Sequence, residues 1–170
     1  MAIHNASIAE ILRRVADLLE IEGANPFRIR AYRRAALTVE DLPQSAANMV
    51  TEGNTLVGLP GIGKDLAAKI TEIIETGQLT ALSEIEARTP TTLAALTTVP
   101  GLGPKRVRQL HKTLGIKTFK ELERAARAHK IRELKGFTAK TEEKLLAEMK
   151  ESRKRELRFK IATAEDFAET

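Results

Sequence analysis

The sequence contains no cysteine and no tryptophan, and it has only one tyrosine and five phenylalanines among 170 residues. Without cysteine, the chain has no disulfides, no thiolate nucleophiles and no cysteine-ligated zinc sites. Because aromatic residues make up only 4% of the sequence, the core has to be built from Ala, Leu, Ile and Val. No apolar run approaches the ~20 residues of a membrane span, and no signal peptide is recognisable. We therefore expect a cytoplasmic protein with no membrane partner.

Positive charge is concentrated in the second half of the chain. The formal net charge is +5, but residues 1–97 carry a net −3, residues 98–160 a net +11 and residues 161–170 a net −3. A basic segment of this kind suggests a polyanionic partner. A solvated, salt-bridged helical surface would explain the same charges, so charge alone does not choose between the two interpretations.

Nearly every segment has the apolar spacing, or the start and stop residues, of a helix. From Ile8 to Leu19 apolar residues recur three and four positions apart, and Gly23 ends that helix. Asn25 and Pro26 supply a cap and a first helical residue for the next one. Further helices are expected from Pro43 to about Gly53, from Lys64 to Thr76, from Pro104 to Gly115, over 119–128 and from Ala139 onwards. Since no segment alternates with a period of two residues, the sequence predicts an all-α fold.

A short pattern occurs three times, as Leu59-Pro-Gly-Ile-Gly63, Val99-Pro-Gly-Leu-Gly103 and Leu134-Lys-Gly-Phe-Thr138. Each copy precedes an amphipathic helix, and the offsets of 40 and 35 residues make each repeat a supersecondary unit. The third copy is degenerate, because Thr138 stands where the second glycine is expected. We predict two small helical lobes, residues 1–88 with the first copy and 89–160 with the other two. Residues 161–170 are expected to begin a following domain.

Two glycines in such a turn permit positive φ and remove Cβ atoms from the approach to the backbone. The amides of the turn and of the next helix can then point outward beside the positive end of the helix dipole, which suits a phosphate oxygen. Amide–phosphate contacts carry no base information, so the pattern predicts sequence-independent, salt-sensitive DNA binding. The expected backbone contacts are Gly61, Gly63, Lys64, Gly101, Gly103, Lys105, Arg106 and Arg108. An ordinary glycine corner is the alternative, which two full copies disfavour.

These turns resemble the helix-hairpin-helix motifs of family X DNA polymerases, the bacterial members above all. Asn25–Ala36 is similar to the second helix of their N-terminal lyase-type domain, and residues 93–128 resemble the subdomain that holds the second hairpin. The resemblance implies gap filling or base excision repair on duplex DNA with a nick, a gap or a 5′-phosphate, by a monomer. The sequence has no Asp-x-Asp, and the family's palm and phosphoesterase domains are missing. We expect no polymerisation, and either a polymerase fragment or a free-standing DNA-binding half.

The resemblance also implies roles for single residues. Lys69 corresponds to the lysine that attacks an abasic sugar aldehyde in lyase members, and Arg28 and Tyr32 correspond to contacts with the 5′-phosphate and the sugar. A deoxyribose-phosphate lyase is therefore the alternative function. Asp65 departs from the lyase pattern, and an acid one turn from Lys69 would raise a pKa that nucleophilic attack needs lowered. Tyr32 is compatible either with stacking on an exposed base or with packing in the core.

Hairpins of this type often hold a monovalent cation through backbone carbonyls. The resemblance implies a Na⁺ or K⁺ site at the carbonyls of Val57, Leu59 and Ile62, and another at those of Thr97, Val99 and Leu102. No other cofactor is expected, since the three histidines have no metal-ligand spacing. A third interpretation of the whole chain is a protein-interaction module whose hairpins only build the fold.

Overall fold

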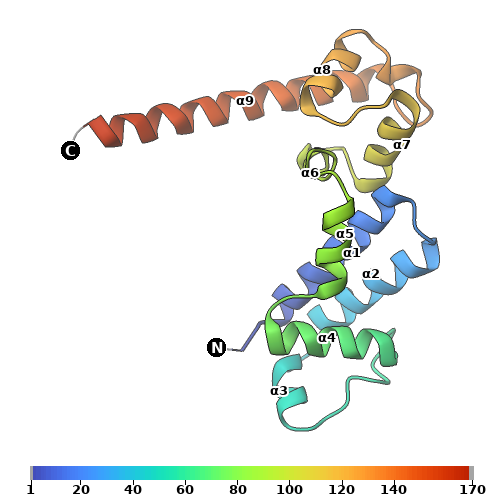
Figure 1. Cartoon of the computed structure of the whole chain (residues 1–170). Helices are drawn as coiled ribbons and strands as arrows, with labels where there is room; N and C mark the ends of the chain where they lie inside the picture. The colour runs from blue at the N-terminus through green and yellow to red at the C-terminus, as the bar shows by residue number, and fades with distance from the viewer. Residues whose placement is uncertain (1, 169–170) are drawn as a thin grey trace. The chain divides into compact units, whose positions relative to one another are not determined.

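The computed structural model describes residues 2–168, with side chains described as far as residue 164, and those residues form helices and turns without a strand (Figure 1). The predicted all-α fold is confirmed. The chain divides into two compact units, Met1–Thr91 and Thr92–Thr170, where the sequence predicts a boundary at 88/89. The first unit contains α1 (Asn5–Glu22), α2 (Pro26–Glu40), α3 (Ala46–Thr51), α4 (Lys64–Thr76) and α5 (Thr80–Arg88). At the boundary and beyond come α6 (Thr91–Ala95), η1 (Leu96–Thr98), α7 (Pro104–Leu114), α8 (Phe119–Arg127), η2 (Ile131–Glu133) and α9 (Ala139–Ala168).

Most helix ends lie where capping residues predict them. Gly23, Gly77 and Gly115 adopt left-handed φ values of 81°, 74° and 69° after α1, α4 and α7. The exception is α3, which begins three residues later than Pro43 predicts. Its start is set by Ser45, whose hydroxyl accepts a hydrogen bond from the Asn48 amide at 3.3 Å. A local cap therefore overrides the proline signal here.

The first unit is built on the packing of α1 against α2. Ile8, Leu12 and Leu19 of α1 are fully buried, and α2 meets them with the small side chains of Ala35 and Ala36, which let the two helices approach closely. Ion pairs cross the same interface, with Arg33 bound to Asp17 at 3.1 Å and to Glu20, and Arg13 bound to Glu40. The core is aliphatic, as the composition predicts.

The second unit packs α7, α8 and the first turns of α9 around buried leucines. Leu110, Leu122 and Leu145 are at most 1% exposed. Beyond Met149 the long α9 leaves this core, and every residue from Lys150 to Ala162 is exposed (Figure 1). Residues 161–168, where the sequence predicts a following domain, continue α9, and 169–170 lie outside the described residues. None of the helices in the described part is long and apolar enough to cross a membrane.

Candidate nucleic-acid interface

All three copies of the repeated pattern fold as the same turn. We call them the first (59–63), second (99–103) and third (134–138) hairpins. The residues in the first glycine position, Gly61, Gly101 and Gly136, have φ values of 78°, 89° and 84°. In each turn the apolar residue that follows this glycine is buried, and its amide donates to the carbonyl three residues earlier, at 2.9 Å, 2.9 Å and 3.1 Å. The third copy is therefore a complete turn in spite of its degenerate sequence.

The second glycine has a different role from the first. Gly63 and Gly103 have extended backbones, with φ of −93° and −80°, and each occupies the cap position of the following helix. Of the two glycines that permit positive φ, only the first in the first and second hairpins adopts it. Neither cap residue has a side chain, and no side chain caps the first amides of α4 or α7. Those amides remain free to bind an anion.

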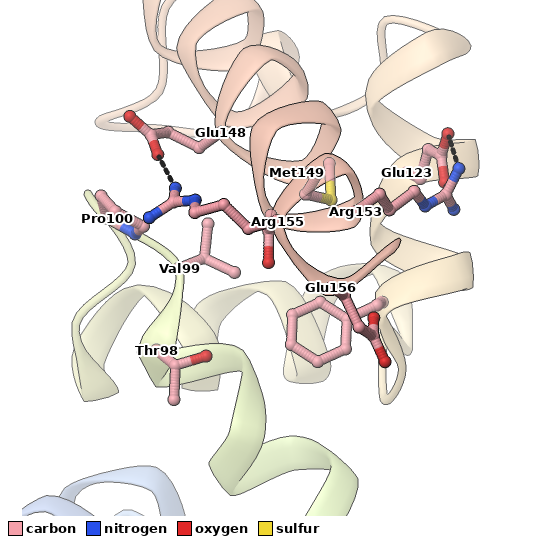
Figure 2. A pocket seen from close by; sticks show the side chains of 11 residues that line it. Thr98, Val99, Pro100, Glu123, Glu148, Met149, Arg153, Arg155 and Glu156 are labelled. Atoms are coloured by element: carbon pink, nitrogen blue, oxygen red, sulfur yellow. Dashed lines mark hydrogen bonds and ion pairs between the residues drawn. The ribbon is translucent and has the colours of Figure 1, made fainter. Parts of the chain in front are cut away.

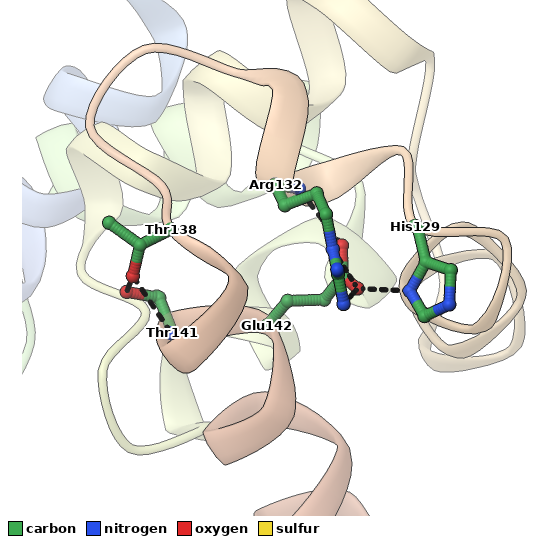
Figure 3. A network of polar contacts seen from close by, with 5 residues as sticks. All are labelled: His129, Arg132, Thr138, Thr141 and Glu142. Carbon is green, nitrogen blue, oxygen red and sulfur yellow. Dashed lines mark hydrogen bonds and ion pairs between the residues drawn. The ribbon is translucent and has the colours of Figure 1, made fainter.

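The third hairpin closes its own helix end. Thr138 occupies the cap position of α9, and its hydroxyl accepts a hydrogen bond from the Thr141 amide at 3.1 Å (Figure 3). Its oxygen also lies 3.0 Å from the Thr141 hydroxyl. A side chain therefore occupies the place that an anion oxygen would take, so this hairpin is less suited to a phosphate than the other two.

The first hairpin is held against α2. The Thr38 hydroxyl donates a hydrogen bond to the Pro60 carbonyl at 2.5 Å. A Cβ on Gly61 would lie 2.8 Å from the Cγ and Cδ atoms of Arg34, so the aliphatic part of that arginine covers the turn. Arg34 is an exposed basic residue at the hairpin that the motif does not identify, because the contact is tertiary. Lys64, at the start of α4, is also exposed.

Lys69 lies in a small polar cluster with Asp65 and Tyr32. Its ammonium is 2.6 Å from a carboxylate oxygen of Asp65 and 5.9 Å from the centroid of the Tyr32 ring. Burial by itself would lower the pKa of Lys69, but the hydrogen bond to Asp65 and the neighbouring Tyr32 outweigh it, and the net shift of the pKa is upward. The upward shift matches the effect expected of Asp65. A lyase needs a lysine in its neutral amine form as the nucleophile. The environment of Lys69 favours the charged ammonium form instead.

The exposed aromatic residue of α2 is Phe27, not Tyr32. Tyr32 is 2% exposed and its buried hydroxyl has no hydrogen-bond partner, so the stacking interpretation is wrong and the core interpretation is right. Phe27 is 74% exposed, and the Arg30 guanidinium lies 4.8 Å from its ring centroid. The sequence offers one indication that Phe27 is exposed. Phe27 lies roughly 200° around α2 from the buried Ile29, and so on the opposite face of the helix. Arg28 is exposed in the same helical turn.

The basic residues after the second hairpin do not all face solvent in the same way. Lys105 is exposed and Arg108 is half-buried. Arg106 donates hydrogen bonds to the carbonyls of Gly101 at 2.9 Å and Gly136 at 3.3 Å. The three residues that the sequence groups together as phosphate contacts thus have different environments.

Comparison with known families agrees with the turn geometry. The model of a helix-hairpin-helix domain matches residues 3–79, and that of a SAM-like helix-hairpin-helix tandem matches residues 93–151, which include the second and third hairpins. Each of the two units therefore contains one of these matches.

This chain is 34% identical over 162 residues to the DNA polymerase/3′-5′ exonuclease PolX of Bacillus subtilis (strain 168). The alignment covers 95% of this chain and 28% of that protein, in its N-terminal part. The expected resemblance to the N-terminal region of a bacterial family X polymerase is confirmed. The two domain matches and this relative support DNA binding in a polymerase-related context.

The carbonyls of the helix-hairpin-helix turns are partly engaged. The Leu59 carbonyl accepts from the Ile62 amide at 2.9 Å, and the Ile62 carbonyl accepts from the Gly58 amide at 3.1 Å. The Val99 carbonyl is engaged in the same way by Leu102. Because a carbonyl oxygen has two lone pairs, each can still bind a cation. A monovalent cation at Val57, Leu59 and Ile62, or at Thr97, Val99 and Leu102, stays a prediction.

A groove of about 490 Å³ lies beside the second hairpin, between residues 98–100, α8 and α9 (Figure 2). Its apolar lining includes Val99, Phe119 and Met149. Its two arginines are neutralised by acids, since Arg153 binds Glu123 and Arg155 lies 4.0 Å from Glu148. The groove therefore lacks the unpaired positive charge that a phosphate backbone requires.

Proposed function

We propose that this chain binds DNA through the sugar–phosphate backbone, without reading base sequence, and that it prefers duplexes with a nick or gap and a 5′-phosphate. It would do so as the DNA-binding portion of a family X repair polymerase, or as a free-standing homologue, in gap filling or base excision repair. The observation that carries the proposal is the contrast among the hairpins. Gly63 and Gly103 leave the helix amides uncapped beside Lys64 and Lys105, whereas Thr138 caps its own helix.

The two units would contribute differently to DNA binding. Residues 98–160 carry a net +11, so the second hairpin and Lys105 supply most of the affinity for any duplex. The first hairpin lies in the slightly acidic half of the sequence and depends on local cations. Arg28, Arg34 and Lys69 are the basic residues of the first unit that would meet a 5′-phosphate.

Phe27 would supply the preference for gapped DNA, because an exposed aromatic ring covered on one side by an arginine can stack on an unpaired base. We expect Phe27→Ala to weaken binding to a gapped duplex by ~10-fold, given stacking worth about 1–3 kcal/mol per base, and to leave intact duplex binding unchanged. Fluorescence anisotropy with gapped and intact duplexes of one length measures both.

Leu37→Ala is the matched control, since Leu37 is another exposed apolar side chain of α2. It should change neither affinity. Equal affinity of the unaltered chain for intact, nicked and gapped duplexes would remove the structural selectivity from the proposal.

Lys69 would act as a cation for the 5′-phosphate and not as a Schiff-base nucleophile. The raised pKa of its ammonium supports this assignment over the lyase alternative. With a 5′-phosphorylated abasic substrate at neutral pH, we expect borohydride to trap no more of the unaltered chain than of Lys69→Ala. Asp65→Asn removes one of the groups that raise the pKa of Lys69, so the lysine pKa should fall and trapping should increase.

Glu75→Gln, at an exposed position of the same helix, provides the control for the loss of one negative charge and should leave trapping unchanged. Efficient trapping of the unaltered chain that disappears in Lys69→Ala would establish the lyase and contradict the assignment of Lys69 as a phosphate cation.

A further inference from the structure

Arg106 of α7 donates hydrogen bonds to both the second and the third hairpin. Nη1 donates to the Gly101 carbonyl at 2.9 Å and Nη2 donates to the Gly136 carbonyl at 3.3 Å. Its guanidinium also lies 5.2 Å from the ring centroid of Phe137, the buried apolar residue of the third hairpin. Two of the five guanidinium N–H groups of Arg106 are therefore bonded to hairpin carbonyls, and its planar face lies near the Phe137 ring.

A second side chain of α7 makes a parallel contact. Gln109, one turn after Arg106, donates to the Lys135 carbonyl at 2.8 Å. On its other side the third hairpin continues into α9, which Thr138 caps. The third hairpin is thus attached to α7 at two consecutive carbonyls, while its own helix end is closed.

We propose that the third hairpin is a brace for the second, and that Arg106 is a positioning residue which holds the second hairpin in its DNA-binding shape instead of contacting phosphate. This inference rests on the proposed function of the second hairpin. The Gly101 carbonyl belongs to the left-handed residue on which the turn depends, so fixing it orders the amides that follow. A guanidinium is required because only a planar fork reaches both carbonyls at once.

The role of Arg106 differs from that of its neighbour Lys105, which is exposed and free to contact DNA. A phosphate contact contributes to the salt dependence of binding, whereas a positioning residue acts on affinity through the shape of the turn. The two residues are adjacent, so they make a matched pair for mutation.

The test uses the full chain with Arg106→Lys, Arg106→Met and Lys105→Ala. Arg106→Lys keeps the charge but reaches only one carbonyl, and Arg106→Met keeps an unbranched stem against Phe137 without donors. Affinity for an intact duplex is measured against salt concentration, and the amide exchange of Leu102 and Phe137 is measured without DNA. Thermal unfolding shows that each variant is folded.

We expect both Arg106 variants to bind DNA ~10-fold more weakly and to exchange the two amides ~10-fold faster, the size of one lost hydrogen bond to a charged group. Arg106→Lys should keep the salt slope of the unaltered chain, whereas Lys105→Ala should lower it by about 0.9, the value for one phosphate contact. If Arg106→Lys binds DNA with full affinity, the positive charge of residue 106 is sufficient for binding. If Arg106→Met binds with full affinity, packing against Phe137 is sufficient. Either result overturns the proposal, as does a slope lowered equally in Arg106→Lys and Lys105→Ala.

The exchange measurement separates this inference from the proposed function. If the unaltered chain binds no duplex DNA, the proposed function fails and the DNA-positioning role of Arg106 fails with it. The exchange rates then still decide whether Arg106 orders the turn, and unchanged exchange in Arg106→Met overturns the brace itself.

Discussion

Replacing Gly103 with Thr should weaken binding to any duplex by about 10- to 100-fold while the chain stays folded, because hydrogen bonds to a charged group contribute about 1.5–3 kcal/mol. A Cβ at position 103 meets no atom within 4 Å, and the backbone there is extended, so the fold accepts a side chain. The new hydroxyl would cap α7 as Thr138 caps α9, and would occupy the amides that we assign to phosphate. Anisotropy titration and thermal unfolding measure the two effects.

The reciprocal change in the third hairpin is the control. Thr138→Gly removes the cap of α9 and should lower the free energy of unfolding by only a few tenths of a kcal/mol, because Gly is itself an acceptable cap. It should not weaken DNA binding, since the third hairpin is not assigned a phosphate. If Gly103→Thr binds as well as the unaltered chain, the uncapped amides of α7 are not the contact.

Replacing Glu142 with Ala should lower the free energy of unfolding of the second unit by about 1–3 kcal/mol, the cost of removing the shared acceptor of several hydrogen bonds. The Glu142 side chain is 1% exposed. Its carboxylate accepts from the Arg132 amide at 2.9 Å and from the Arg132 Nε at 3.1 Å, and it lies 2.8 Å from Nδ1 of His129 (Figure 3). His129 itself has a left-handed φ of 58°.

The stability that Glu142 contributes should depend on pH in a defined direction. Burial by itself would raise the pKa of this carboxyl, but the hydrogen bonds from His129 and Arg132 outweigh it, and the net pKa lies below the ordinary value of 4.5. A lowered pKa means that the contribution is complete above the ordinary value and is lost as the pH falls through the folded-state pKa. The difference between the unaltered chain and Glu142→Gln should therefore shrink in acid, as urea unfolding at several pH values would show.

Glu143→Ala is the matched control for Glu142, because it removes the same charge from the next position of α9, where the side chain is exposed. It should change the free energy of unfolding by less than about 0.5 kcal/mol. An equal loss in the two variants would mean that helix charge, and not the buried contacts of Glu142, stabilises this unit.

The elements that local chemistry determines were predictable from the sequence. Gly77, Gly115 and the Asn25–Pro26 pair set helix ends within a few residues, so the boundaries of α2, α4 and α7 follow from them. The repeated turns were recognisable for the same reason, since a left-handed residue between two helices favours glycine. The function of the second glycine was not predictable in detail. This glycine does not supply a positive φ; because it has no side chain, it leaves the first amides of the next helix uncapped.

Residues whose roles depend on tertiary contacts could not be assigned from spacing alone. Arg34 covers the first hairpin from another helix, and Glu142 is buried against Arg132 and His129, contacts that no local pattern indicates. Arg106 is grouped with Lys105 in the sequence because both are basic and adjacent, although two of its N–H groups are bonded to carbonyls of the second and third hairpins. For Tyr32, position on the apolar stripe of α2 was the better guide, while Phe27 lies off that stripe and is exposed.

The most direct test of the central claim is the salt dependence of binding to two duplexes of unrelated sequence. If the uncapped hairpins and the +11 segment bind the phosphate backbone, the logarithm of the association constant should fall steeply and linearly with the logarithm of salt concentration. The two duplexes should give the same slope and the same affinity, since backbone contacts carry no base information. A flat dependence would favour a protein-interaction module, and different affinities for the two sequences would mean that bases are read; either result contradicts the claim.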